Sequence, residues 1–215
     1  MKIFEALRAA LEGCVEPDGL FISAPRHASV CVLVAEGGTT PRICFIRRAR
    51  WDGDPWSEHI AFPGGSRDGD ETPQETVRRE VLEEVGVALS EDSELMQLPQ
   101  LRIRLAGRER LLLLDPFVCH VPGPLPELRC GPEVASAFWT PVSELWNAQN
   151  LDHLVLGDQG DLLVYPAIRL PQGTVFGITL RVLTLLSDQL GIPMHYLEEI
   201  PLLRRERKGE QRVDT

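Results

Sequence analysis

The chain has 215 residues, of which 43% are hydrophobic and 25% are charged, and its formal net charge is −10. This composition is ordinary for a globular protein, and the negative charge argues against nucleic acids and anionic membranes as partners. No stretch reaches the roughly 20 apolar residues of a membrane span, and the first residues lack the apolar core of a signal peptide. We therefore expect a cytoplasmic protein, a monomer or a homodimer, that binds neither nucleic acid nor a membrane.

Five cysteines are scattered along the chain without the spacing of a zinc site or a redox pair. Cys31, Cys44 and Cys119 lie inside apolar runs. Thiols in such positions are usually buried, and in the cytosol they stay reduced. We expect free thiols at these three positions rather than disulfides.

In chain order, the first predicted element is an amphipathic helix at residues 2–13, where Ile3, Leu7 and Leu11 recur at helical spacing. A linker rich in proline and glycine follows. We divide the chain into this N-terminal helix and linker (1–27), a main domain (28–190) and a C-terminal extension (191–215). The polar end of the extension, 204–215, is expected to fray.

The main domain mixes strands and helices. Two strand-like runs, 28–35 and 42–49, flank Gly37-Gly38 and predict a hairpin. Further strands are expected at 100–105, 109–121 and 135–139, and helices at 142–148 and 174–190. The last helix is expected to be apolar at Ile178, Val182, Leu185 and Leu186.

The segment 72–86 carries the signals of a helix with two defined ends. Thr72 is a good N-cap, with Pro73 at the first helical position and Glu75 at the third, as in a capping box. Gly86 is a signal for the C-terminal end. The inner face is apolar at four-residue intervals, at Val77, Val81 and Val85, with Leu82 beside them.

Three glutamates, Glu80, Glu83 and Glu84, share another face of this helix, because residues three and four apart are neighbours. Like charges at these spacings destabilise an isolated helix by roughly 0.2–0.5 kcal/mol per pair. A bound cation reverses that effect, and Mg²⁺ binds carboxylates together with substrate phosphates and water. Just upstream, Gly64 and Gly65 break an apolar run into a loop. A solvated charged face is the alternative, but the combined pattern predicts metal held against a phosphate.

The same segment resembles the Nudix box, which reads Gly, five residues, Glu, seven residues, Arg-Glu-apolar, one residue, Glu-Glu, one residue, Gly-apolar. The matching positions are Gly65, Glu71, Arg79, Glu80, Val81, Glu83, Glu84, Gly86 and Val87. Nine defined positions at fixed spacing make this motif far more specific than a lone glycine motif.

The resemblance implies a hydrolase that splits a diphosphate linked to another moiety, with Mg²⁺ or Mn²⁺ as cofactor. It also implies an α+β fold, an α/β/α sandwich with a mixed central sheet, to which this chain adds an N-terminal and a C-terminal helix. The implied metal ligands are Glu80, Glu83, Glu84 and the carbonyl of Gly65. Arg79 would orient Glu83 through an i, i+4 salt bridge, and Glu71 would support the loop and the start of the helix.

Segments outside the box resemble the coenzyme A pyrophosphatase subfamily: 44–49, 60–65, 165–166 and 175–181. The substrate implied is coenzyme A or acyl-CoA, and the products are 4′-phosphopantetheine, or its acyl form, and adenosine 3′,5′-bisphosphate. Arg48 matches the subfamily arginine, so it is a candidate phosphate contact together with Gly64 and Gly65. Because Arg47 and Arg48 face opposite sides of a strand, only one can point at the site. A strand-edge salt bridge is the alternative for Arg48.

The subfamily pattern expects a further Arg and a Gly in the stretch 50–59, but here the stretch is about one residue longer and has no clean counterpart to either. A different nucleotide substrate, such as ADP-ribose or a dinucleoside polyphosphate, therefore stays open. A ligand-binding module without turnover is a third alternative.

Two further assignments also stay open. The general base is either a box glutamate or Glu133, for which an exposed turn beside Pro132 is the other interpretation. For His59 an ordinary structural role is favoured over a substrate contact. For Trp51 and Trp56 local packing is favoured over stacking on an adenine.

Overall fold

A computed structural model of the chain describes residues 26–54, 56–104, 111–156, 163–192 and 194. The predicted N-terminal helix at 2–13, most of its linker, and the polar end at 204–215 lie outside the described residues. Within the described ranges, no helix has the length and apolar composition needed to cross a membrane.

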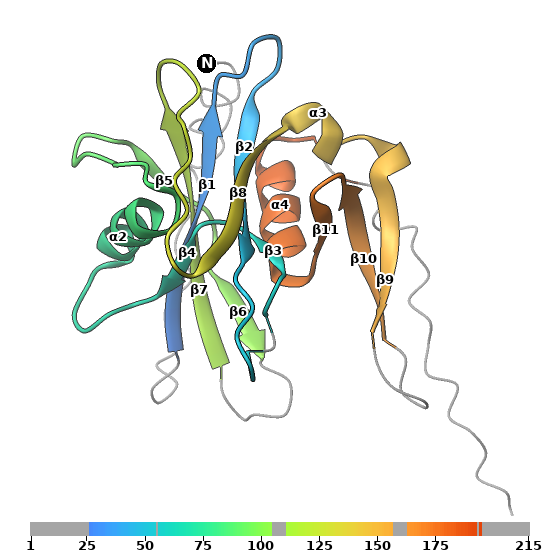
Figure 1. The fold of residues 1–215 in the computed structure, drawn as a ribbon, viewed down its shortest axis with the longest axis horizontal. Helices are drawn as coiled ribbons and strands as arrows, with labels where there is room; N and C mark the ends of the chain where they lie inside the picture. The colour runs from blue at the N-terminus through green and yellow to red at the C-terminus, as the bar shows by residue number, and fades with distance from the viewer. Residues whose placement is uncertain (1–25, 55, 105–110, 157–162, 193, 195–215) are drawn as a thin grey trace, which may run out of the picture.

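A mixed sheet forms the centre of the molecule (Figure 1). Strand β1 (Arg26–Ala35) pairs antiparallel with β2 (Arg42–Arg48) and parallel with β7 (Leu111–Val121). The predicted hairpin is confirmed, with Val34 opposite Ile43. The other strands of this sheet are β3 (Ile60–Ala61), β4 (Gly64–Ser66), β5 (Leu95–Gln97), β6 (Leu101–Arg104) and β8 (Val134–Pro141).

Helices α2 (Pro73–Val85) and α4 (Gly177–Gln189) lie on opposite sides of the sheet, so the layers are helix, mixed sheet, helix, as predicted (Figure 1). Alternation along β1 supplies both cores: Cys31 and Leu33 pack on the α2 side, whereas Val32 and Val34 pack on the α4 side. The valine stripe of α2 is fully buried: Val77, Val81 and Val85. Leu82, predicted to lie beside the stripe, is instead 52% exposed.

A second sheet of three strands contains β9 (Leu151–Leu156), β10 (Leu163–Leu170) and β11 (Gly173–Phe176). The prediction that the last helix begins at Thr174 is therefore wrong. Residues 173–176 pair antiparallel with β10, and the helix begins only at Gly177. Of its predicted apolar positions, Val182 and Leu186 are buried.

The helix predicted at 142–148 is shorter than expected. Helix α3 covers Val142–Leu145, and a separate 3₁₀ turn, η1, covers Ala148–Asn150. The side chain of Asn147 accepts a hydrogen bond from the Gln149 N–H, which starts that turn. The chain thus breaks where an asparagine offers the backbone a local partner.

The predicted free thiols are confirmed at Cys31, Cys44 and Cys119, which are all buried. Burial raises the pKa of the Cys119 thiol to about 11, so it stays protonated. Cys130, in contrast, is exposed.

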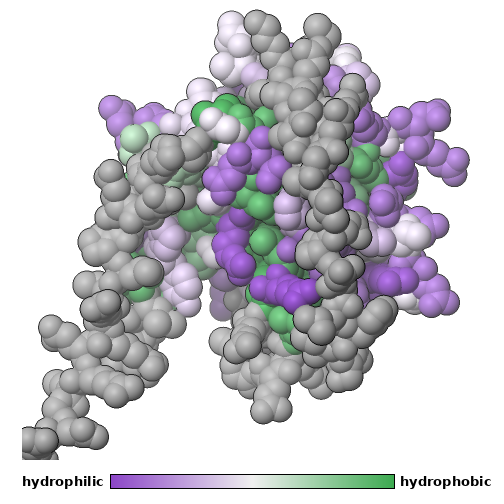
Figure 2. Space-filling model, turned by 180° about the vertical axis from the view of Figure 1, so that it is seen from behind, coloured by the Kyte–Doolittle hydropathy of each residue, from purple (hydrophilic) through white to green (hydrophobic). Residues whose placement is uncertain are grey.

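Seen from behind, the described surface is mostly hydrophilic, with hydrophobic side chains visible in a vertical band near the middle (Figure 2).

Candidate metal and phosphate site

Helix α2 is fixed at its N-terminus by a side-chain capping box and at its C-terminus by a backbone hydrogen bond. The Thr72 hydroxyl accepts a hydrogen bond from the Glu75 N–H at 3.2 Å, and the Glu75 carboxylate accepts one from the Thr72 N–H at 2.7 Å. At the other end Gly86 adopts φ 71°, and its N–H donates to the Leu82 oxygen at 3.0 Å. The predicted capping box and glycine end are confirmed, and they set which side chains face the sheet.

Glu84 joins this helix to the glycine loop. Glu84 is only 4% exposed, and its Oε2 accepts a hydrogen bond from the Gly64 N–H at 2.8 Å. Burial raises the pKa of Glu84 to about 7, the nearby Glu80 acts in the same direction, and the Gly64 N–H opposes both. A buried carboxylate of this kind gains stability from any cation that binds next to it.

Glu80 lies directly against Gly65. A methyl group at residue 65 would overlap the Glu80 carboxylate, so only glycine leaves room for it. Burial raises the pKa of Glu80, although the ion pair with Arg79 works against that shift. Two carboxylates, Glu80 and Glu84, therefore face two consecutive glycines.

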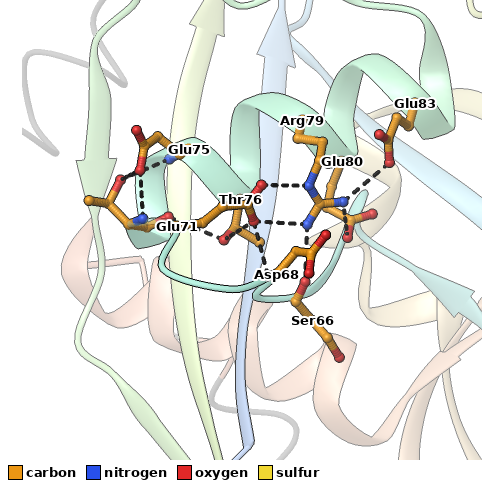
Figure 3. Close-up of polar contacts among 9 residues, drawn as sticks. Ser66, Asp68, Glu71, Glu75, Thr76, Arg79, Glu80 and Glu83 are labelled. Atoms are coloured by element: carbon orange, nitrogen blue, oxygen red, sulfur yellow. Dashed lines mark hydrogen bonds and ion pairs between the residues drawn. The ribbon is translucent and has the colours of Figure 1, made fainter.

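Arg79 lies at the centre of the surrounding carboxylates (Figure 3). Its guanidinium donates to both oxygens of Glu71, at 2.7 and 3.0 Å. Its Nη1 reaches Glu80 at 2.8 Å and Glu83 at 3.2 Å, and its Nη2 reaches the Ser66 oxygen at 3.1 Å. One rigid, planar group thus fixes three carboxylates and the loop backbone.

Glu71 forms the support of this arrangement. It accepts hydrogen bonds from the Asp68 N–H at 3.1 Å and from the Thr76 hydroxyl at 3.0 Å (Figure 3). The hydrogen bonds from Arg79, followed by the one from Asp68, lower the pKa of Glu71 to about 2. Glu71 therefore stays charged and ties the loop to the first turn of the helix.

The donor set fits a hard divalent cation, although the three glutamates do not converge completely. In the described part of the chain, no three His, Cys, Asp or Glu side chains stand close enough together to enclose a metal. The side chain of Glu83 is 58% exposed and is connected to Glu80 only through Arg79. The oxygen chemistry nevertheless suits Mg²⁺ or Mn²⁺, because the pKa values of Glu80 and Glu84 stay raised by burial despite the nearby charges of Arg79 and Arg48, so a bound cation would stabilise both carboxylates.

Arg48 borders the same carboxylates from strand β2. It lowers the pKa of Glu84 as a lesser contribution, and its Nη2 lies 3.1 Å from the Asp54 carboxylate. Arg47 points elsewhere and donates to the Gln172 backbone oxygen. The pairing of β2 with β8 shifts register between the two arginines. The two arginines thus contact different partners, and the salt bridge of Arg48 to Asp54 matches the alternative interpretation of this residue.

Glu133 approaches the site from the loop before β8. Its backbone oxygen accepts a hydrogen bond from the Ala49 N–H at 2.8 Å, and the Gly131 N–H donates to the backbone oxygen of Glu84 at 3.1 Å. The Glu133 carboxylate contributes, as the smallest cause, to the raised pKa of both Glu80 and Glu84. The loop therefore places an exposed carboxylate near the two glutamates.

Sequence reasoning did not single out Asp54 or Ser66. The Asp54 carboxylate accepts a hydrogen bond from the Trp56 N–H at 3.0 Å as well as pairing with Arg48. An Asp followed by Pro is a turn signal, and this signal could have drawn attention to Asp54. The Ser66 contact uses a backbone oxygen and leaves no trace in the sequence.

The protein is thus an α+β sandwich in which the carboxylates of helix α2 lie against a glycine loop. Such carboxylate oxygens are suited to binding a divalent cation. Residues 25–157 match the model of the NUDIX domain, and the chain belongs to the Nudix family. Its architecture is the Nudix hydrolase fold.

The chain is also similar to individual proteins and solved structures. The uncharacterized protein C14C4.10c of Schizosaccharomyces pombe is 35% identical over 142 residues, which cover 56% of this chain and 43% of that protein. The chain thus matches less than half the length of this relative. A MutT/nudix family protein from Enterococcus faecalis is similar in fold, with a TM-score of 0.57 and 17% identity over 87% of this chain and 69% of that one.

A second similar structure is a bifunctional NMN adenylyltransferase/ADP ribose pyrophosphatase from Francisella tularensis, complexed with AMP and a manganese ion. The TM-score is 0.50 with 17% identity, over 88% of this chain and 47% of that one. At this level of identity the likeness concerns the fold alone.

Proposed function

We propose that the protein is a metal-dependent hydrolase that splits the diphosphate of a nucleoside diphosphate-linked substrate. The observation that carries this proposal is the position of Glu84 and Glu80, two carboxylates held against Gly64 and Gly65 by Arg79 and a backbone N–H. This arrangement concentrates negative charge at a loop whose backbone can approach a phosphate closely.

The proposed metal ligands are Glu80, Glu83, Glu84 and the Gly65 carbonyl, and the cofactor is Mg²⁺ or Mn²⁺. When bound, the cation neutralises phosphate oxygens and lowers the pKa of bound water. Arg79 orients the carboxylates, because its planar fork contacts Glu80 and Glu83 together. Positioning and charge stabilisation of this kind dominate phosphoryl transfer.

Two residues at the rim complete the proposed machinery. Arg48 holds a phosphate oxygen from the strand side, and its Nε is buried without a hydrogen-bond partner among the described residues. Glu133 accepts the proton from the attacking water, since its exposed carboxylate lies near Glu80 and Glu84. The box glutamates remain the alternative base.

The leading substrate is coenzyme A or acyl-CoA, split into 4′-phosphopantetheine, or its acyl form, and adenosine 3′,5′-bisphosphate. The support is the resemblance of segments 44–49, 60–65, 165–166 and 175–181 to the coenzyme A pyrophosphatase subfamily. In the structure, two of these segments lie side by side, because β2 pairs with β3.

A specific observation favours the second candidate, another nucleotide such as ADP-ribose or a dinucleoside polyphosphate. The loop 50–59 contains Arg50 but no clean counterpart to the expected further arginine, and it supplies Asp54, which pairs with Arg48. This loop therefore contributes negative charge where the subfamily pattern expects positive charge. A substrate with a 3′-phosphate gains less from such a loop.

A panel assay with Mg²⁺ separates these candidates. Product release is followed for coenzyme A, its thioesters, ADP-ribose and dinucleoside polyphosphates, with and without the metal. We expect metal-dependent release and the highest kcat/KM with coenzyme A or a thioester. Preference for ADP-ribose would support the second candidate, and no release from any substrate would indicate a binding module.

A further inference from the structure

Three partly buried aromatic side chains from separate segments meet next to strand β3. The rings of His59 and Phe176 are 4.8 Å apart in an edge-to-face arrangement, and Tyr165 lies 6.4 Å from Phe176 in a similar arrangement. His59 precedes β3, Tyr165 lies in β10 and Phe176 ends β11. We call these three side chains the ring cluster.

Backbone contacts place the ring cluster next to Arg48. The His59 oxygen accepts a hydrogen bond from the Arg48 N–H at 3.0 Å. The Thr179 hydroxyl, in the first turn of α4, donates to the Ile60 oxygen at 3.0 Å. Helix α4, which follows Phe176 directly, is thereby fixed against β3. Arg48 is therefore within electrostatic range of both His59 and Glu84.

The ring cluster is chemically different from the rest of the site. Burial lowers the pKa of His59, with the charge of Arg48 acting in the same direction and Asp54 opposing, so the imidazole is neutral at neutral pH. Uncharged rings do not attract phosphate, but they stack on other planar groups. The protein has a net charge of −10, which repels the phosphates of a nucleotide. The nucleobase is uncharged and planar, so it is the part of a nucleotide on which these rings can stack.

We infer that the ring cluster of His59, Tyr165 and Phe176 binds the nucleobase of the substrate while Arg48 contacts the adjoining phosphate. This inference rests on the proposed function, and it places the nucleoside half of the substrate beside β3 and β11. Phe176 is the central member, since it contacts both other rings.

Equilibrium binding tests this inference without turnover. Calorimetry compares AMP with ribose 5-phosphate, which differ only in the base, for the wild type and for Phe176→Leu, Phe176→Trp and Tyr165→Leu. The wild type should prefer AMP by at least about fivefold, the lower end of what base stacking on an aromatic side chain contributes. Phe176→Leu and Tyr165→Leu should lose most of that preference, whereas Phe176→Trp should keep it.

Trp51→Leu is the matched control, because Trp51 is an aromatic residue of the preceding loop that is 57% exposed and lies outside the ring cluster. Its AMP preference should equal that of the wild type. Absence of any preference for AMP in the wild type would overturn the inference, and so would a preference that survives both leucine substitutions in proteins with unchanged melting temperatures.

The two proposals fail separately. If the protein hydrolyses nucleotides but does not distinguish AMP from ribose 5-phosphate, the ring cluster is only a packing contact and the proposed function stands. If a Phe176-dependent preference for AMP exists without hydrolysis of any substrate, the base site stands and the proposed activity falls.

Discussion

Glu84 is the residue whose charge depends most on the folded structure. Its burial raises the pKa from an ordinary value of 4.5 to about 7, and one backbone N–H partly compensates. A carboxyl with a higher pKa in the folded state binds more protons folded than unfolded between these two values. The free energy of unfolding of the metal-free protein therefore falls as the pH rises through this window.

Substitution of Glu84 by Gln should remove much of this pH dependence. At about pH 8 without metal, the variant should exceed the wild type in free energy of unfolding by up to about 3 kcal/mol, and at about pH 4 the two should be similar. Urea unfolding in the presence of a chelator measures the difference. A wild type that is as stable at the higher pH as at the lower one would contradict the assignment.

Arg79 acts at the same scale by holding several carboxylates with one planar group. Lysine carries the same charge but cannot contact Glu71, Glu80 and Glu83 together. We expect Arg79→Lys to lower kcat about 100-fold, the size of effect caused by misplacing catalytic groups by ~1 Å. Steady-state kinetics measures the effect, and circular dichroism verifies the fold.

The neighbouring Arg78 provides the control for that substitution. It donates to the Glu91 and Ser93 backbone oxygens at 3.0 and 3.3 Å and contacts none of the box glutamates through a hydrogen bond. Arg78→Lys should leave kcat within about twofold of the wild type. Equal losses in the two variants would show that Arg79 has no special role.

At the scale of elements, the glycine loop and α2 depend on each other, and two adjacent glycines should respond differently to alanine. Gly64 has φ 148°, and a methyl group there would overlap the Ser29 oxygen and the Val30 backbone. Gly64→Ala should therefore lose at least about 2 kcal/mol of stability. At Gly65 the methyl group would displace only the Glu80 carboxylate. Gly65→Ala should fold normally but lose metal-dependent activity.

Gly69→Ala serves as the control, because Gly69 has φ 51° with open space around it. It should lose about 1 kcal/mol from the backbone conformation alone, with unchanged activity. Thermal unfolding and kinetics on the three variants separate backbone strain from damage to the site. Equal stabilities for Gly64→Ala and Gly65→Ala would contradict the described packing.

Helix α2 could be predicted almost completely from the sequence, because its signals are local. Thr72, Glu75 and Gly86 act within one turn of their partners, and the valine stripe follows directly from the helical period. The exposure of Leu82 could not be predicted, since it depends on how far the sheet extends over the helix. The predicted first residue of α4 was also wrong. Residues 173–176 pair with β10 instead, and this tertiary contact overrides the local sequence pattern.

For the site, sequence spacing placed Glu80, Glu83 and Glu84 on one face of α2 next to the glycine loop, but the side chain of Glu83 is 58% exposed. The structure contains the ion pair from Arg79 to Glu83 that the resemblance implied. The spacing could not show that Glu71 accepts two hydrogen bonds from Arg79 across the loop. Nor could it show the pairing of Arg48 with Asp54, which depends on the path of residues 49–59. Contacts within one helix were predictable, and those that need a loop conformation were not.

At the scale of the whole molecule, the layered fold was predictable from its motif, whereas the second sheet was not. Strand β9 contains the polar residues Asp152 and His153 and buries little of its surface, so its hydrophobic alternation is weak. This sheet nevertheless carries Tyr165 and Phe176 toward His59. The part of the molecule with the weakest sequence signal thus completes the ring cluster.

The whole chain has a net charge of −10 and is proposed to bind an anionic diphosphate, so cations must offset the repulsion. Calorimetric titration of Mg²⁺ and Mn²⁺ into the metal-free protein tests this requirement most directly. We predict saturable binding to the wild type, weakened at least about tenfold in Glu80→Gln and in Glu84→Gln, both still folded. A wild type that takes up neither ion, or variants that bind them as tightly as the wild type does, would contradict the assignment of α2 as a metal-binding helix.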